Sequence, residues 1–428
     1  MVKWSVLLLL SVMIVSGNLL GQPPLDEYGI IPDQVYKESI KSVLLYRAGW
    51  ELSYPIIELN SSEQITLSFD DLSDDIKNYS YTLIHCDENW YPSVIQDEEF
   101  MEGFNSNQIY DYALSSNTDV GYVHYTLNIP NEDVRLRLSG NYIIKIFEDY
   151  NFENIIMTKR FAVTESAVSV DAEVIRPITP PYMDTGHEII FSVLYGQLNI
   201  IDPFSELLVR VCQNNRWDLT LNNIKPLIVR DGIIEYSNHA QNILPGGNEY
   251  RQFDMKSLKY QSESVKNIDY ISPYYHVELV PDKPRQKNDY FFNEDLNGRF
   301  FIDIQGSGKK NTDADYVYVH FTLLQDSPLT DGHIYVFGAL TNWSIGNTSM
   351  MEYNSDRAAY DLTLLLKQGF YNYEYVFVSD RTKVIDPFNF EGSHFEAEND
   401  YVIYIYYRPA NSRYDRLVGY QVVNSLRQ

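Results

Sequence analysis

The residue types that most often perform chemistry in proteins are scattered along this 428-residue sequence without a recognisable spacing. Metal centres built on nitrogen and sulfur need short fixed spacings such as H-x-H, H-E-x-x-H or paired C-x-x-C, and none occurs among the eight histidines and two cysteines. No G-x-S-x-G turn presents a serine nucleophile, and for neither Cys86 nor Cys212 does the sequence identify a base on the same face of its strand. We therefore expect no catalytic residues, no metal site, no cofactor and no enzyme activity.

Paired carboxylates are the remaining catalytic possibility, because a glycosidase needs only two of them about 5 to 9.5 Å apart. The sequence contains 59 acidic residues, so close pairs must occur somewhere by abundance alone. Runs such as Asp97-Glu98-Glu99 lie in no recognisable catalytic frame. We interpret them as solvated faces.

A different chemistry, the stacking of an indole on a sugar ring, is suggested by residues 334–387. Their apolar alternation and their Asn, Gly and Asp turns are typical of a small β-sandwich. The segment resembles the glycogen-binding type of immunoglobulin-like domain, and Trp343 occupies the place of its first sugar-stacking indole. Lys383 and Glu374 stand where that resemblance implies a second indole and a lysine. We interpret Trp343 as a packed turn residue, and keep a periplasmic glycan-binding protein with Trp343 as its platform as the alternative function.

Tyrosine and arginine gather near the C-terminus of this otherwise acidic chain. Both residue types dominate binding hot spots, since each combines large contact area with directed hydrogen bonds. Two interpretations stay open: a last strand packed on its own core with arginines paired to local acids, or a surface that binds a partner. The candidate partner-binding residues are Tyr404, Tyr406, Arg408, Arg413, Tyr414 and Arg416.

The elements that would position these residues are short strands separated by turn clusters. Strand-like runs occur at 42–47, 64–70, 80–86, 122–129, 141–148, 158–163, 188–195, 206–213, 232–236, 276–280 and 299–304. The Asp70-Asp71 pair is interpreted as a turn cluster after the second run, and residues 306–312 as a flexible linker. Residues 238–287 are poorly periodic and could form an extended docking arm or an irregular loop.

The strand spacing predicts an all-β fold of three successive immunoglobulin-like β-sandwich domains with little helix. We expect a signal peptide at 1–21, a first β-sandwich domain at 35–165, a second β-domain at 166–306, a third, glycogen-binding-like β-sandwich domain at 313–408 and a C-terminal tail at 409–428. The N-terminal segment has a basic residue, a short apolar stretch and small residues for cleavage, which predicts export. We expect a soluble protein, and in a Gram-negative cell a periplasmic one.

The net charge is −26 with a pI near 4.6. Nucleic acids and anionic lipid surfaces are bound through clustered Lys and Arg, so neither is expected as a partner. Cys86 and Cys212 fall in different predicted domains. We therefore expect packing, rather than a structural disulfide, to stabilise the fold.

Several segments together resemble the Plug protein family of the type IX secretion system. They cover nearly the whole chain after residue 21, and their order and spacing carry the likeness: 67–72 (LSFDDL), 125–137 (YTLNIPNEDVRLR), 139–142 (SGNY), 246–254 (GGNEYRQFD), 295–300 (DLNGRF), 314–323 (ADYVYVHFTL), 367–373 (KQGFYNY) and 413–416 (RYDR).

The resemblance implies a periplasmic protein of successive β-domains that docks on the periplasmic mouth of a giant outer-membrane β-barrel translocon and seals it, gating protein export. The protein would be peripheral to the outer membrane through this partner and a monomer outside the complex. The family has no catalytic residues to transfer, and its contact residues cannot be assigned position by position.

Overall fold

The computed structural model describes residues 30–73, 75–196, 198–237, 241–306 and 308–426, so the expected signal peptide lies outside the described residues. The chain is mostly β, with 46% of its residues in strands and 6% in helices. The strands form several mainly antiparallel sheets, which confirms the β-rich fold expected from the alternating pattern. No helix in the described part combines the length and apolar character that crossing a membrane requires.

The first unit packs two sheets around a core of aliphatic and tyrosine side chains. Alternate residues of its strands, such as Tyr79, Tyr81 and Leu83, point into this core, as the period of a strand dictates. One sheet contains β1 (Gln34–Val35), β12 (Ile155–Thr164), β11 (Gly140–Glu148), β5 (Tyr79–Cys86), β7 (Asn107–Gln108) and β3 (Ile56–Glu58). The other contains β2 (Ile40–Arg47), β4 (Ile65–Asp71), β9 (Val123–Ile129) and β8 (Asp111–Leu114). Beside them lie α1 (Asp97–Phe100) and the pair β6 (Met101–Gly103) and β10 (Val134–Leu136).

The second unit combines residues 169–245 with the last two strands of the chain. Its core lies between sheets that are far apart in sequence, and Val211 on one strand pairs with Ile403 on another. One sheet contains β13 (Ser169–Ile175), β14 (Gly186–Leu194), β18 (Ile233–Tyr236), β17 (Ile228–Arg230) and β19 (Ile243–Pro245). The other contains β16 (Thr220–Leu221), β15 (Leu207–Gln213), β30 (Asp400–Tyr407) and β31 (Arg416–Asn424); the short helical elements are η1 (Tyr182–Asp184) and α2 (Pro203–Glu206).

The third unit holds the strands from residue 251 to residue 386. Val317, Val319 and Phe321 alternate into its core from one sheet and meet the aromatic strand of the other sheet. One sheet contains β20 (Arg251–Asp254), β28 (Gly369–Ser379), β23 (Phe300–Ile302), β25 (Gly332–Phe337) and β29 (Ile385–Asp386). The other contains β21 (Val265–Ile271), β22 (Tyr274–Leu279), β24 (Tyr316–Leu324), β27 (Ala359–Lys367) and β26 (Glu352–Asn354), and the helical elements are α3 (Lys310–Asp313), η2 (Ala339–Thr341) and α4 (Phe388–Glu391).

The units therefore do not follow one another simply along the chain. Strand β30 was expected to close the third domain, and instead pairs with β15 in the second unit. Strands β22 and β23 were expected in the second domain and lie in the third unit, on β24 and β28. Residues 306–312 connect two strands of the third unit rather than two domains, and the irregular segment 238–287 supplies β20, β21 and β22. Alternation along a sequence locates strands, but it carries no information about distant partners.

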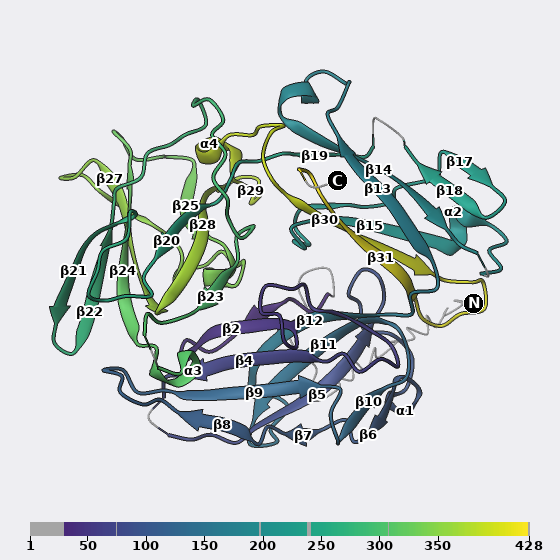
Figure 1. Ribbon diagram of the computed structural model, residues 1–428, viewed down its shortest axis with the longest axis horizontal. Coiled ribbons are helices and arrows are strands. Elements are labelled where there is room, and N and C mark those ends of the chain that lie inside the picture. The colour runs from purple at the N-terminus through teal and green to yellow at the C-terminus, as the bar shows by residue number, and fades with distance from the viewer. Residues whose placement is uncertain (1–29, 74, 197, 238–240, 307, 427–428) are drawn as a thin grey trace, which may run out of the picture.

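The three units are arranged around a common centre (Figure 1). The first unit lies at the bottom of this view, the third at the left, and the second, with the yellow C-terminal strands, at the upper right. Each unit consequently contacts both of the others.

Candidate functional site

The C-terminal tyrosines are not available to a partner. Strand β30 lies between β15 and β31, and both of its faces are covered. Tyr404 and Tyr406 face the first unit, where they pack in a cluster that includes Ile56 and Ala162. Tyr406 is fully buried and donates a hydrogen bond to Asn141 Oδ1 at 2.8 Å. The prediction that these two tyrosines contact a partner is wrong, because both rings are buried within the chain. A central strand that is buried on both faces needs large side chains, so their presence did not indicate a binding surface.

The C-terminal arginines and Tyr414 also make contacts within the chain. Arg413 pairs with Glu99, and the Arg416 guanidinium donates to Glu165 Oε1 at 3.0 Å. The first pair holds the loop before β31 against the first unit, and the second holds the first residue of β31 there. The Arg408 guanidinium pairs with Asp415. Tyr414 packs edge-on against His85, with ring centroids 5.6 Å apart. Arg408 and Arg413 still expose 42% and 60% of their side chains, so a role for them in partner binding stays a prediction.

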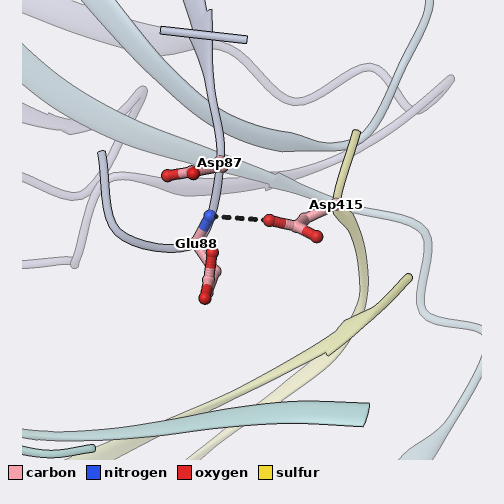
Figure 2. A group of neighbouring side chains, drawn as sticks. All are labelled: Asp87, Glu88 and Asp415. Atoms are coloured by element: carbon pink, nitrogen blue, oxygen red, sulfur yellow. Dashed lines mark hydrogen bonds between the residues drawn. The ribbon is translucent and has the colours of Figure 1, made fainter. Parts of the chain in front are cut away.

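Three carboxylates, those of Asp87, Glu88 and Asp415, meet where this loop touches the first unit (Figure 2). The Glu88 amide donates to Asp415 Oδ2 at 3.0 Å. Burial, reinforced by the charge of Asp415, raises the pKa of Glu88. Two arginines offset the negative charge, since Arg210 lies 3.3 Å from Glu88 Oε1 and Arg408 contacts Asp415. The group therefore acts as an ion-pair network that joins the first and second units.

Trp343 lies where the second and third units meet, and its ring is engaged by protein. The Arg216 guanidinium sits over the indole, 4.8 Å from the ring centroid, and Phe337 packs edge-on at 5.4 Å. Glu374, at the position of the family lysine, is buried and accepts a hydrogen bond from Arg216 at 2.8 Å. Lys383, at the position of the second indole, exposes 70% of its side chain. A glucose ring would have to displace Arg216, and the position of the second indole holds Lys383.

A buried ion pair joins the first and third units. Lys367, at the end of β27, donates to Asp70 Oδ2 at 2.6 Å, and their side chains are 1% and 0% exposed. The Tyr316 hydroxyl donates to the same oxygen at 2.7 Å, and His124 Nδ1 lies 2.6 Å from Asp70 Oδ1. The Lys367 ammonium also sits over the Tyr122 ring, 4.1 Å from its centroid. Asp70 and Asp71 form the buried end of β4, so their interpretation as a turn cluster is wrong.

Several cavities among the described residues are lined by more than one unit, and two of them are the largest of these. One, of about 680 Å³, is lined by Arg160, Trp217 and Trp343. The other, of about 460 Å³, is lined by Tyr54, Asp295 and several C-terminal residues. Arg160 covers the Trp90 ring at 4.7 Å in the first cavity, and a guanidinium on an aromatic ring serves packing and orientation.

Comparison with known proteins agrees with this architecture. Residues 40–165 match the family described as type 9 secretion system plug protein 1st domain. The crystal structure of a hypothetical protein from Parabacteroides merdae ATCC 43184 is 37% identical, covers 91% of this chain and 98% of that chain, and superposes with a TM-score of 0.88. Residues 40–165 therefore belong to the type 9 secretion system plug protein first-domain family. No curated protein matches it, and the plug family is not an enzyme family.

Most of the residues that join the three units were not identified from the sequence. Asp70, Arg216 and Lys367 each find their buried partner more than 150 residues away along the chain. The local signal was a charged residue inside a strand-like run, as with Asp70 at the end of the run 64–70. Cys86 and Cys212 are both buried and free.

Proposed function

We propose that this protein is a periplasmic plug, which docks on the periplasmic opening of a giant outer-membrane β-barrel translocon of the type IX secretion system and seals it. The observation that carries the proposal is the match of residues 40–165 to the plug first domain. The 37% identity to a structure that covers 91% of the chain extends the relationship beyond that domain. Family membership implies association with the translocon and a periplasmic location.

The physical requirement for a seal is a body that keeps its shape across a wide opening. Separate domains on flexible linkers would let water and solutes pass between them. Here each pair of units shares buried contacts: Lys367 with Asp70, Tyr406 with Asn141, and Arg216 with Glu374. These contacts hold the three units together at their junctions, and the volume of the protein rather than bond chemistry would close the channel.

The charge of the chain favours reversible docking. A net charge of −26 would steer the protein towards a basic rim, and steering raises the rate of association more than it raises the affinity. A seal of standard size, burying on the order of 1,600 Å², can have an affinity from micromolar to picomolar. A seal of this kind can persist at rest and still release when cargo loads.

The direct test is ion conductance through the purified translocon in a planar bilayer. Adding the protein to the periplasmic side should reduce the conductance in a saturable way, and an unrelated acidic protein of similar mass serves as the control for charge. Affinity purification from solubilised outer membrane should recover one very large barrel. An open channel at saturating protein, or purification without the barrel, would overturn the proposal.

No contact in the structure favours the glycan-binding alternative. The indole of Trp343 is covered by Arg216, and the two other positions of the platform hold Glu374 and Lys383. The same conductance experiment with soluble α-glucan present provides a check, because a glycan-dependent change would revive that alternative.

A further inference from the structure

A second group of carboxylates lies where the chain passes between the second and third units. Glu249 is in the crossover from β19 to β20, and Glu398 is in the return crossover from α4 to β30. Asp295 comes from the loop before β23. One carboxylate oxygen from each residue lies within 4.8 Å of the other two.

The two crossovers run side by side at this point. The His394 amide donates to the Gly247 carbonyl at 2.8 Å, and the Asn399 side chain donates to the Gly246 carbonyl at 2.7 Å. Both segments pass between the second and third units at the top of Figure 1, near α4 and β19. The three carboxylates are therefore brought together by a crossing of backbones, and no local sequence spacing reveals them.

Asp295 accepts hydrogen bonds from the Tyr250 and Asn297 amides and Glu398 Oε1 accepts one from Asn424, but one oxygen of Glu249 is left unused. Glu249 Oε1 accepts from the Tyr290 hydroxyl at 2.5 Å and from the Glu398 amide at 2.9 Å. Glu249 Oε2 is buried and has no hydrogen-bond partner, in a residue that is only 1% exposed. Asn297 Oδ1 is likewise buried without a partner, in a residue 4% exposed that lines the same 460 Å³ cavity as Asp295 and Glu398. A buried carboxylate oxygen without a donor is costly, so a cation bound beside such an atom would stabilise it.

The nearby Arg285 compensates Glu249 only through space, without an ion pair. No ion pair among the described residues includes Glu249, Asp295 or Glu398, and the nearby Arg285 pairs with Glu391 and donates to the main-chain oxygen of Glu249. The group in Figure 2 differs, because Arg210 and Arg408 lie against it.

We propose that Glu249, Asp295 and Glu398 bind a divalent cation, with Asn297 Oδ1 available as a further oxygen ligand, and that the cation fastens the two crossovers between the second and third units. The ligand set is all oxygen and irregular, which suits Ca²⁺ better than the strict octahedron of Mg²⁺. Bound Ca²⁺ would fix the angle between these units at the point where only two chain segments join them. This site is independent of the plug function.

The test is calorimetric titration of the full chain with CaCl2 after treatment with EDTA. We expect one site per chain, with an affinity near the roughly 0.1 to 1 mM typical of extracellular calcium modules. The melting temperature should rise by several degrees in about 5 mM CaCl2, because the ion binds the folded state alone. The rise should be absent in EDTA.

Substitutions in the two carboxylate groups show which of them binds Ca²⁺. Glu249→Gln and Asp295→Asn should each weaken Ca²⁺ binding at least about tenfold. In EDTA both variants should melt at or above the temperature of the unchanged protein, because each removes a buried charge that makes no ion pair. Asp87→Asn, in the arginine-compensated group, is the matched control and should leave binding unchanged. Absence of binding at millimolar Ca²⁺, or binding that is lost in Asp87→Asn and kept in the other two, would overturn the proposal.

Discussion

The buried pair between Asp70 and Lys367 gives the sharpest test of how the first and third units are held together. The Asp70→Asn substitution keeps the shape of the side chain and an oxygen that can still accept from Tyr316. It removes the charge that faces the Lys367 ammonium at 2.6 Å. Loss of one partner from a buried ion pair costs about 3 to 5 kcal/mol.

The same magnitude follows from proton chemistry. Burial lowers the pKa of Lys367, and the charge of Asp70 opposes that effect. Without Asp70 the lysine can escape the penalty by losing its proton, which at pH 7 costs about 4.6 kcal/mol for a group with an ordinary pKa near 10.4. At pH 9 the same escape costs about 2 kcal/mol. A lysine with a depressed folded-state pKa gains stability as pH rises, so the Asp70→Asn penalty should shrink from pH 7 to pH 9.

The assay is urea unfolding of the unchanged protein, Asp70→Asn, Lys367→Met and the double variant, at both pH values. The double variant should recover at least about 2 kcal/mol of the Asp70→Asn loss, because it leaves no unpaired buried charge. Asp380→Asn is the control: its pair with Lys383 is 54% and 70% exposed, so it should cost below about 0.5 kcal/mol. A penalty under about 1 kcal/mol at pH 7, a penalty equal at both pH values, or a double variant no more stable than Asp70→Asn would refute the reasoning.

Four further outcomes are expected. Burial lowers the pKa of His85 to about 4. The stability contributed by this neutral, buried side chain is therefore complete above pH 6.5 and is lost as pH falls towards 4. Over that range, the difference between the free energies of unfolding of the unchanged protein and His85→Gln should shrink by on the order of 3 kcal/mol. Denaturant titration measures this difference. Tyr406→Phe should cost about 1 to 3 kcal/mol in the same titration, because Asn141 Oδ1 loses its buried donor. Trp343→Ala should also destabilise by about 1 to 3 kcal/mol, while indole fluorescence of the unchanged protein stays constant during titration with soluble α-glucan. Association with the translocon, followed by surface plasmon resonance, should slow as ionic strength rises, because added salt screens the charge of −26.

The strands themselves were predictable from the sequence. The runs at 80–86 and 141–148 correspond to β5 (Tyr79–Cys86) and β11 (Gly140–Glu148), and the run at 206–213 corresponds to β15 (Leu207–Gln213). Alternation of apolar side chains marks a strand with one buried face, and a short, mostly apolar run marks a strand that is buried on both faces. For this reason the β-rich fold was confirmed.

The pairing of distant strands was not predictable. Nothing in residues 400–407 indicates that they continue the sheet of β15, because an apolar tyrosine-rich strand suits any core. The sequence suggested Tyr404 and Tyr406 as binding residues because tyrosine is common both in buried junctions and on binding surfaces. The decision between the two rests on what covers the outer face of the strand, and here the first unit covers it.

The polar junctions explain why the three units adopt one arrangement. Apolar surfaces alone tolerate sliding, whereas the carboxylate of Asp70 must meet the ammonium of Lys367 and the Tyr316 hydroxyl at once. A displacement of about 1 Å at that junction would leave a buried charge without its partner, at a cost of several kcal/mol. The pair of Arg216 and Glu374 imposes the same condition between the second and third units. Since the two conditions involve different pairs of units, they fix the ring of units jointly, and a body fixed in this way can match one opening.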